Sequence, residues 1–327
     1  MIQQILSQAA SIFLLIGLGL LAARTKIFPE DGTDVLCRLQ LNVVTPVMIL
    51  VTMQGHTFAG QLAMDTLWSF LSYGLTVAAV GLLSFPLVRL LRLGEEDQGV
   101  CRIQLAFKNI GFMGIPLVSA VLGQRPGVVI VLMNTLFGVL LYSLGMVLLL
   151  YRRGCRVFSR DFLRRVVNLP LVSSLLGILV LVTGFTLPET VNRGLTLVSD
   201  MMVPLGMFIV GLQLSRTDLR RIVSPRNLAF CVISLILVPL LALGIGSLLP
   251  ESAAVTATLV FAMAMPSGTL CAILTEETGR NTDLASGTLA LSTLLSLGTL
   301  PVWALFLLSH FPLRIFTPPE RSEPYET

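Results

Sequence analysis

The chain has 327 residues, of which 54% are hydrophobic and 12% are charged. Soluble domains carry about 25% charged residues, so this composition excludes an ordinary water-soluble protein. The net charge of +4 does not indicate a nucleic-acid partner, because the basic residues fall in short clusters between apolar runs. The cysteines stand singly, without the spacing of a metal site or a disulfide framework. We therefore expect a lipid bilayer as the surroundings, and no metal or cofactor.

Apolar stretches long enough to cross a hydrocarbon core of about 30 Å recur along the whole chain. Windows of about nineteen residues predict ten spans, at residues 4–23, 35–54, 66–88, 99–122, 127–150, 169–187, 192–214, 227–249, 253–275 and 283–308. The longest charged connection lies near the middle. We predict a first five-helix repeat at residues 1–151, a cytoplasmic linker at 152–168, a second repeat at 169–308 and a C-terminal tail at 309–327.

Basic residues are distributed unevenly between the two sides of these spans. Seventeen lysines and arginines fall in the odd-numbered connections, against only four on the other side. Because cytoplasmic loops are enriched in basic residues, this pattern places both termini outside the cytoplasm. The first apolar run has no basic lead and no cleavage signature, so we expect it to remain as a span.

The two halves of the chain share landmarks in the same order. The matched residues are Pro46 with Pro204, Pro116 with Pro266, and Thr135 with Thr293. The second, fourth and fifth spans thus correspond to the seventh, ninth and tenth, which makes the repeat unit five helices. An odd unit inserts the opposite way round the second time, as in the inverted repeats of many secondary transporters. Chance similarity between apolar segments is the alternative.

The fourth and ninth spans contain residues that suit a lipid-facing helix poorly. Proline removes a backbone hydrogen bond and glycine weakens a helix, and interrupted backbone is tolerated in a membrane only beside protein or a water-filled cavity. These residues are Lys108, Asn109, Gly111, Gly114 and Pro116 in the fourth span, and Pro266, Ser267 and Gly268 in the ninth. The alternative is that each proline only kinks its helix for packing.

Two broken helices in corresponding places point to a transporter's binding site. Each break exposes N-terminal N–H groups with partial positive charge, which suits an anion. We predict substrate contacts at the breaks and on the matched spans, where hydrogen bonding between helices is the alternative role. The predicted substrate-binding residues are Asn109, Pro116, Pro266, Ser267, Asn134 and Asn42.

Two ionisable residues lie well inside predicted spans, Lys108 in the fourth and Asp200 in the seventh. A charge at that depth costs several kcal/mol unless it is paired or hydrated, so each is a functional hypothesis. Asp200 is the candidate carrier of a coupling proton, with Lys108 as a coupling or charge-pair candidate. The alternatives are a static ion pair between the two residues, or a position of Asp200 in an outer vestibule.

At these residues the chain resembles the auxin efflux carrier family of membrane transporters, which includes plant auxin exporters and bacterial members labelled as malonate or malate permeases. The resemblance covers essentially the whole chain. It rests on the pattern N-x-x-x-M-G-I-P at 109–116, on AMPSG at 264–268, on the proline-centred second and seventh spans, and on STLLSLGTLP at 292–301.

The resemblance implies an all-α fold of ten helices similar to sodium/proton antiporters and bile-acid symporters, with the fourth and ninth spans crossing at their prolines. It carries the family's carboxylate-contacting asparagine over to Asn109, and it implies a homodimer contact through scaffold helices. The long central cytoplasmic loop of the plant exporters is absent, so a malonate- or malate-like carboxylate fits better than an auxin-like one.

We expect a secondary transporter in a bacterial inner membrane that moves a small organic anion by alternating access. An enzyme is not expected, because an intramembrane hydrolase needs an acid pair or a nucleophile with a base at mid-depth, and both histidines, His56 and His310, lie near span ends. No phosphate-binding loop is present, so an ATP-driven pump is not expected either. A sodium-coupled symporter of the same fold and a membrane sensor are the alternatives. Proton coupling, sodium coupling and uncoupled flow all fit the sequence.

Overall fold

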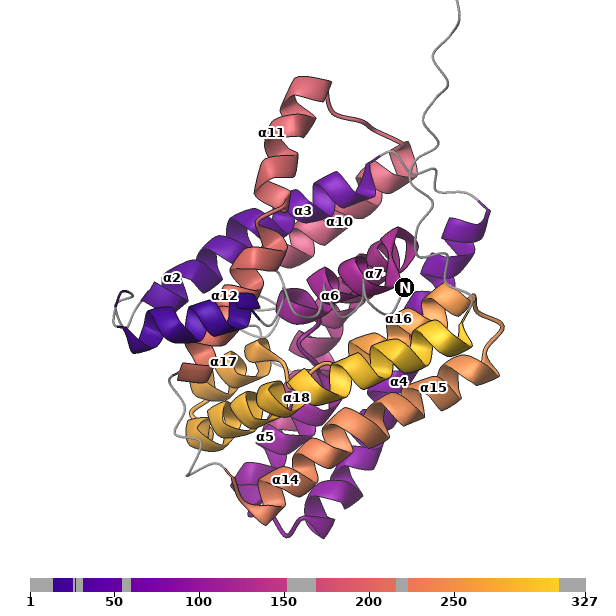
Figure 1. The fold of residues 1–327 in the computed structure, drawn as a ribbon. Helices are drawn as coiled ribbons and strands as arrows, with labels where there is room; N and C mark the ends of the chain where they lie inside the picture. Colours follow the sequence, from indigo (N-terminus) through magenta and orange to yellow (C-terminus); the bar gives the residue numbers. More distant parts are fainter. Residues whose placement is uncertain are drawn as a thin grey trace, which may run out of the picture.

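The computed structural model describes residues 14–25, 27, 32–54, 60–151, 169–215 and 223–311. These residues form helices and one isolated bridge, with no strand among them (Figure 1). Five helices in this part are long and apolar enough to cross a membrane: Ala63–Leu90, Gln124–Leu150, Glu189–Leu212, Pro225–Leu248 and Thr282–His310. Shorter apolar helices are Leu14–Arg24, Val35–Val51, Ile110–Leu122 and Ala253–Met263. The fold is that of an integral membrane protein.

Several long helices consist of shorter elements joined end to end. The first half of the chain contains α2 (Gly32–Leu39), η1 (Gln40–Val44), α3 (Thr45–Met53), α4 (Gln61–Leu90), α5 (Glu95–Ala106), η2 (Ile110–Gly114), α6 (Ile115–Leu122), α7 (Gln124–Leu140), η3 (Leu141–Gly145) and α8 (Met146–Leu150). The second half contains α10 (Leu169–Thr183), α11 (Glu189–Ser199), α12 (Met202–Ser215), α14 (Pro225–Val232), η4 (Ile233–Leu237), α15 (Val238–Leu248), α16 (Ala253–Met263), α17 (Thr269–Glu277) and α18 (Thr282–His310). The predicted linker at 152–168 and most of the predicted tail, 312–327, lie outside the described residues.

The helices pack in two groups. In the first, α3 contacts α10 and α11, and α2 contacts α12, at the upper left of Figure 1. In the second, α4 packs on α5, α15 on α16, and α14 on α18. Helices α14, α15 and α18 run side by side across the lower part of Figure 1. Helix α7 contacts α10 of the first group and α4 and α16 of the second, and α12 contacts η2. The two groups therefore meet around α7, η2 and α12.

Helix Leu14–Arg24 and α12 approach until their backbones touch, because glycines face each other. A Cβ built on Gly211 would lie 2.1 Å from the carbonyl oxygen of Ile16, and one on Gly19 would lie 2.1 Å from that of Phe208. Small residues commonly line such helix contacts in membranes, where lipid is as apolar as the side chains and packing supplies the attraction. This contact fixes the first described helix against the first group.

Three π-helical turns each precede a proline in the same register. Segments η1, η2 and η4 end two residues before Pro46, Pro116 and Pro239, and the residue before each proline donates its N–H five residues back. Proline has no N–H to donate, so carbonyls in the preceding turn lose their usual partner. In a membrane those carbonyls need another donor.

The carbonyls freed by Pro239 find donors in side chains from other helices. The Nζ of Lys108 donates to the carbonyl oxygen of Ser234 at 3.0 Å, and the indole Nε1 of Trp303 donates to that of Leu235 at 3.0 Å. One proline thus determines where two long side chains bind, and it links η4 to the fourth predicted span and to α18.

Replacing Trp303 by phenylalanine should lower the thermal midpoint of the purified protein, because Leu235 then keeps a buried carbonyl without a donor, at a cost of about 1–3 kcal/mol. In a Pro239→Ala background the restored backbone N–H can serve Leu235, so the same change should cost clearly less. Midpoints of the four proteins in one detergent measure this coupling. Equal losses in both backgrounds would show that the proline does not free this carbonyl.

Charged side chains gather where α4 and α7 begin and α15 meets α16. Asp65, buried on α4, accepts from Nε and Nη2 of Arg125 at 2.8 and 2.6 Å. Nearby, the loop residue Glu251 accepts from the hydroxyl of Thr256 at 2.8 Å. Burial raises the pKa of Glu251, the Thr256 hydrogen bond lowers it, and the charge of Asp65 raises it. The net direction is upward, so this carboxyl is held in a setting that favours its neutral form.

A raised pKa means that the folded protein binds this proton more tightly than the unfolded chain does. The contribution of this proton to the free energy of unfolding is therefore fully present at pH values below the ordinary glutamate range. It is lost as the pH rises through the raised pKa of Glu251. Glu251→Gln should match the wild type at acidic pH and become progressively more stable than it as the pH rises. Thermal midpoints of both proteins across a pH series provide the measurement. A constant difference at every pH would contradict the assignment.

Candidate functional site: the crossing of two interrupted helices

The centre of the molecule contains two helix breaks that satisfy each other's backbone. Helix α5 ends at Ala106 and helical geometry resumes at Ile110; helix α16 ends at Met263 and α17 begins at Thr269. Between these ends the chains cross, with Lys108 and Ser267 forming an isolated antiparallel bridge. The N–H of Asn109 donates to the carbonyl of Pro266 at 2.9 Å, and the N–H of Gly268 donates to that of Phe107 at 3.1 Å. Non-helical backbone inside a membrane protein is tolerated when its N–H and C=O groups find partners in the protein, as they do here.

Gly268 allows the two chains to approach this closely. A Cβ at this position would lie 3.1 and 3.2 Å from the carbonyl oxygens of Phe107 and Lys108. Both neighbours are backbone atoms held by the crossing itself, so they cannot move aside independently. Little room is therefore left for a side chain at this position.

Gly268→Val should therefore destabilise the protein strongly, because two branched methyl groups must enter this narrow space. Gly298→Val on α18 is the matched control, since a Cβ at Gly298 meets no atom within 4 Å. The yield of monodisperse protein and its thermal midpoint should drop for the first variant and change little for the second. Similar behaviour of the two would argue against a tight crossing.

The crossing does not lie at both prolines, as the sequence predicted. Pro266 is in it, but Lys108 is eight residues before Pro116. Pro116 is instead buried as the second residue of α6, directly after the π turn of η2. The expectation of a crossing at Pro116 is therefore wrong, and the physical reason is that Pro116 follows a π turn that keeps η2 and α6 one continuous helix.

Polar groups from both breaks converge beside the crossing. Asn109 is only 4% exposed and its Nδ2 donates to Oγ1 of Thr269 at 3.4 Å. The N–H of Ser267 donates to Oγ of Ser292 on α18 at 3.2 Å. The Ser267 hydroxyl is buried and has no hydrogen-bond partner among the described residues. The helices that start at Ile110 and Thr269 also direct first-turn N–H groups and partial positive charge towards this place.

Lys108 is completely buried in the crossing. Its ammonium donates to both the hydroxyl and the carbonyl oxygen of Ser234. No ion pair joins it to Asp200, although both residues are within the part that the structure describes. The ion pair considered from the sequence is thus absent.

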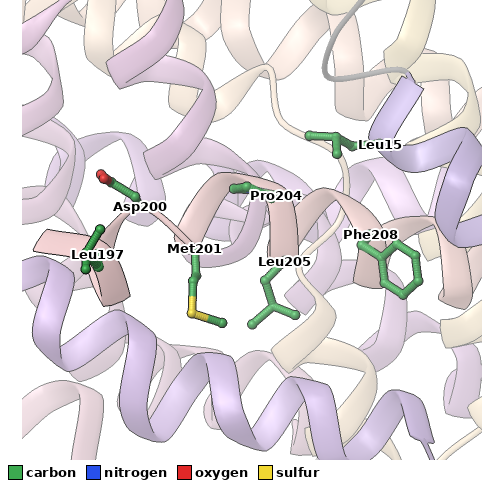
Figure 2. Close-up of a pocket in the computed structure, with 7 residues that line it drawn as sticks. All are labelled: Leu15, Leu197, Asp200, Met201, Pro204, Leu205 and Phe208. Carbon is green, nitrogen blue, oxygen red and sulfur yellow. The ribbon is translucent and has the colours of Figure 1, made fainter. Parts of the chain in front are cut away.

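Asp200 lies in a different part of the first group. It is exposed at the turn between α11 and α12, where it is one of the residues that line an open pocket of about 480 Å³; the other lining residues are apolar (Figure 2). The other lining residues are Leu15, Leu197, Met201, Pro204, Leu205 and Phe208. The burial that suggested a coupling role from the sequence is not found here.

The two remaining predicted residues lie at different distances from the crossing. Asn134, half-buried on α7, places its Oδ1 3.6 Å from where a Cβ of Gly111 in η2 would be. Asn42 is exposed in η1. The structure therefore brings together Asn109, Pro266, Ser267 and Lys108, with Asn134 adjacent, and it places Asn42 and Asp200 elsewhere.

Sequence reasoning missed four polar residues at or near the crossing: Ser234, Thr269, Ser292 and Gln40. Ser234 could have been found from its position five residues before Pro239. Gln40 is a fully buried amide whose Oε1 has no partner in the described part of the chain. A Cβ on Gly206 of α12 would lie 2.8 Å from both Gln40 Nε2 and the carbonyl oxygen of Phe112. This contact brings the second, fourth and seventh predicted spans together.

These features define a polytopic helical membrane protein with a polar crossing of broken helices inside it. The chain belongs to the membrane transport protein family, the auxin efflux carrier family, whose model matches residues 4–304. It is also 28% identical over 298 residues to an uncharacterized transporter of Methanothermobacter thermautotrophicus, covering 91% of this chain and 96% of that protein. The protein is accordingly a membrane transporter, and the resemblance seen in the sequence is confirmed.

Proposed function

We propose that this transporter moves a small organic anion, a carboxylate, by alternating access. The observation that carries the proposal is the buried Asn109 side chain beside the crossing, where two helices begin. An amide N–H and helix N-termini are suitable donors for a carboxylate, and the donors come from both halves of the chain. Asn109, Pro266 and Ser267 form the proposed site with Asn134 beside it, and we keep Asn42 of η1 and Pro116 of α6 as proposed contacts on the neighbouring elements.

Two inverted repeats of five helices are the proposed architecture, and the register of the crossing supports it. Pro46 and Pro204 are 158 residues apart, as are Thr135 and Thr293. The pairing of Pro116 with Pro266 gives 150, whereas the bridged residues Lys108 and Ser267 are 159 apart. With this corrected landmark, all three separations agree to one residue.

Alternating access would follow from relative motion of the two helix groups. The crossing belongs with the second group, and it meets the first group through η2 and α12, so a displacement there would open the site to one side and then the other. We place the protein in a bacterial inner membrane with both termini outside the cytoplasm, and we propose a homodimer through the first group. A malonate- or malate-like carboxylate is the proposed cargo.

Asn109→Ala should abolish carboxylate uptake into proteoliposomes without preventing membrane insertion, because it removes the central donor of the site. Thr269→Val keeps the shape but removes the hydroxyl that receives the Asn109 amide, and it should reduce uptake only partly. Fluorescence-detected size exclusion of both variants checks folding. Wild-type uptake by a well-folded Asn109→Ala protein would refute the site.

The class of cargo can be tested by binding alone. Monocarboxylates and dicarboxylates should raise the thermal midpoint of the wild type, and their uncharged amides should not, because the site offers donors and positive helix ends. Stabilisation by amides as strong as that by acids would contradict an anion site.

A further inference from the structure

The Lys108 side chain places its amino group where an isolated charge is costly. It is fully buried, and burying an ammonium group without compensation is strongly unfavourable. Within the described residues no carboxylate forms an ion pair with it. The stabilisation must therefore come from neutral oxygen atoms and helix ends around it.

Those oxygen atoms form a small cation site. The N–H of Val238 donates to Ile233 in the π turn, and Pro239 has no N–H, so the Ser234 carbonyl has no backbone donor and the ammonium of Lys108 donates to it at 3.0 Å. The Ser234 hydroxyl is a second ligand. Ser267 lies directly opposite Lys108 in the bridge, so their side chains share one face, and its buried hydroxyl has no partner in the described part of the structure.

Helix ends add to this preference for a cation. Helices α5 and α16 both terminate next to the crossing, and helix C-termini carry partial negative charge. Freed carbonyls and the C-terminal ends of broken helices are also the groups that coordinate sodium in secondary transporters. In this chain a covalently attached ammonium already occupies such a position, one residue from Asn109.

We propose that Lys108 is a built-in cation that takes the place of a coupling sodium ion and balances one negative charge of the anion bound at Asn109. The second part rests on the function proposed above, whereas the first does not depend on it. Transport by the wild type then needs no sodium. Removing the lysine side chain leaves the two oxygen atoms of Ser234 without their cation, next to the unpartnered hydroxyl of Ser267.

The first test compares sodium chloride with choline chloride at equal ionic strength, without any anionic substrate. The wild type should have the same thermal midpoint in both salts. Lys108→Ala should be stabilised by sodium in a concentration-dependent way, and adding Ser234→Ala should reduce that response. Sodium stabilisation of the wild type would overturn the proposal, and so would identical midpoints for a folded Lys108→Ala protein.

The second test uses Lys108→Gln, which keeps a hydrogen-bond donor of similar length but loses the charge, and it decides the matter if the alanine variant does not fold. The dissociation constant for malonate should rise by about tenfold or more, while any weak binding of malonamide should not change. Unchanged malonate affinity would overturn the role of Lys108 as a counter-charge. Failure of the wild type to bind any carboxylate would instead refute the proposed function and leave the sodium test to judge the cation.

Discussion

Backbone groups that lose their helical partner must find another one in a membrane, and this requirement shapes the centre of the molecule. Hydrocarbon offers no hydrogen bonds, so a free N–H or C=O is tolerated only against protein or water. At the crossing, Asn109 and Gly268 donate to Pro266 and Phe107 across the two chains. Behind it, Trp303 and Lys108 supply donors for carbonyls that Pro239 has freed. At these two places the irregularity of one helix is thus compensated by a residue of another.

The interrupted helices also present donors and acceptors to a ligand that a regular helix keeps in its own hydrogen bonds. Two helices begin beside Asn109 and two end beside Lys108, so donors and acceptors lie next to each other within a few residues. The first arrangement suits an anion and the second suits a cation. The amide of Asn109 would then bind the anion, and the ammonium of Lys108, the residue before it in the chain, would be the cation. The pocket at Asp200 has one carboxylate and otherwise apolar walls, and it offers no comparable set of donors.

Much of this was predictable from the sequence. Hydropathy indicated a polytopic helical protein, and glycine and proline in the fourth and ninth spans indicated interrupted helices, because these residues weaken a helix regardless of its surroundings. The location of the crossing was not predictable from Pro116, since a π turn absorbs that proline and the break falls at Lys108. Nor could hydropathy tell that Asp200 is exposed or that Lys108 binds Ser234, because both depend on which helices become neighbours. Pro239 indicates from the sequence that a carbonyl in the preceding turn needs another donor, but which carbonyl it is becomes clear only from the π turn η4.

The most direct test is to locate a bound carboxylate in an experimental structure, with a brominated analogue such as bromomalonate marking the position by its anomalous signal. The account predicts the bromine beside Asn109, within reach of the first turns that begin at Ile110 and Thr269, with Lys108 still bound to Ser234. A bromine in the pocket of Leu197 and Asp200, with the crossing empty, would contradict it.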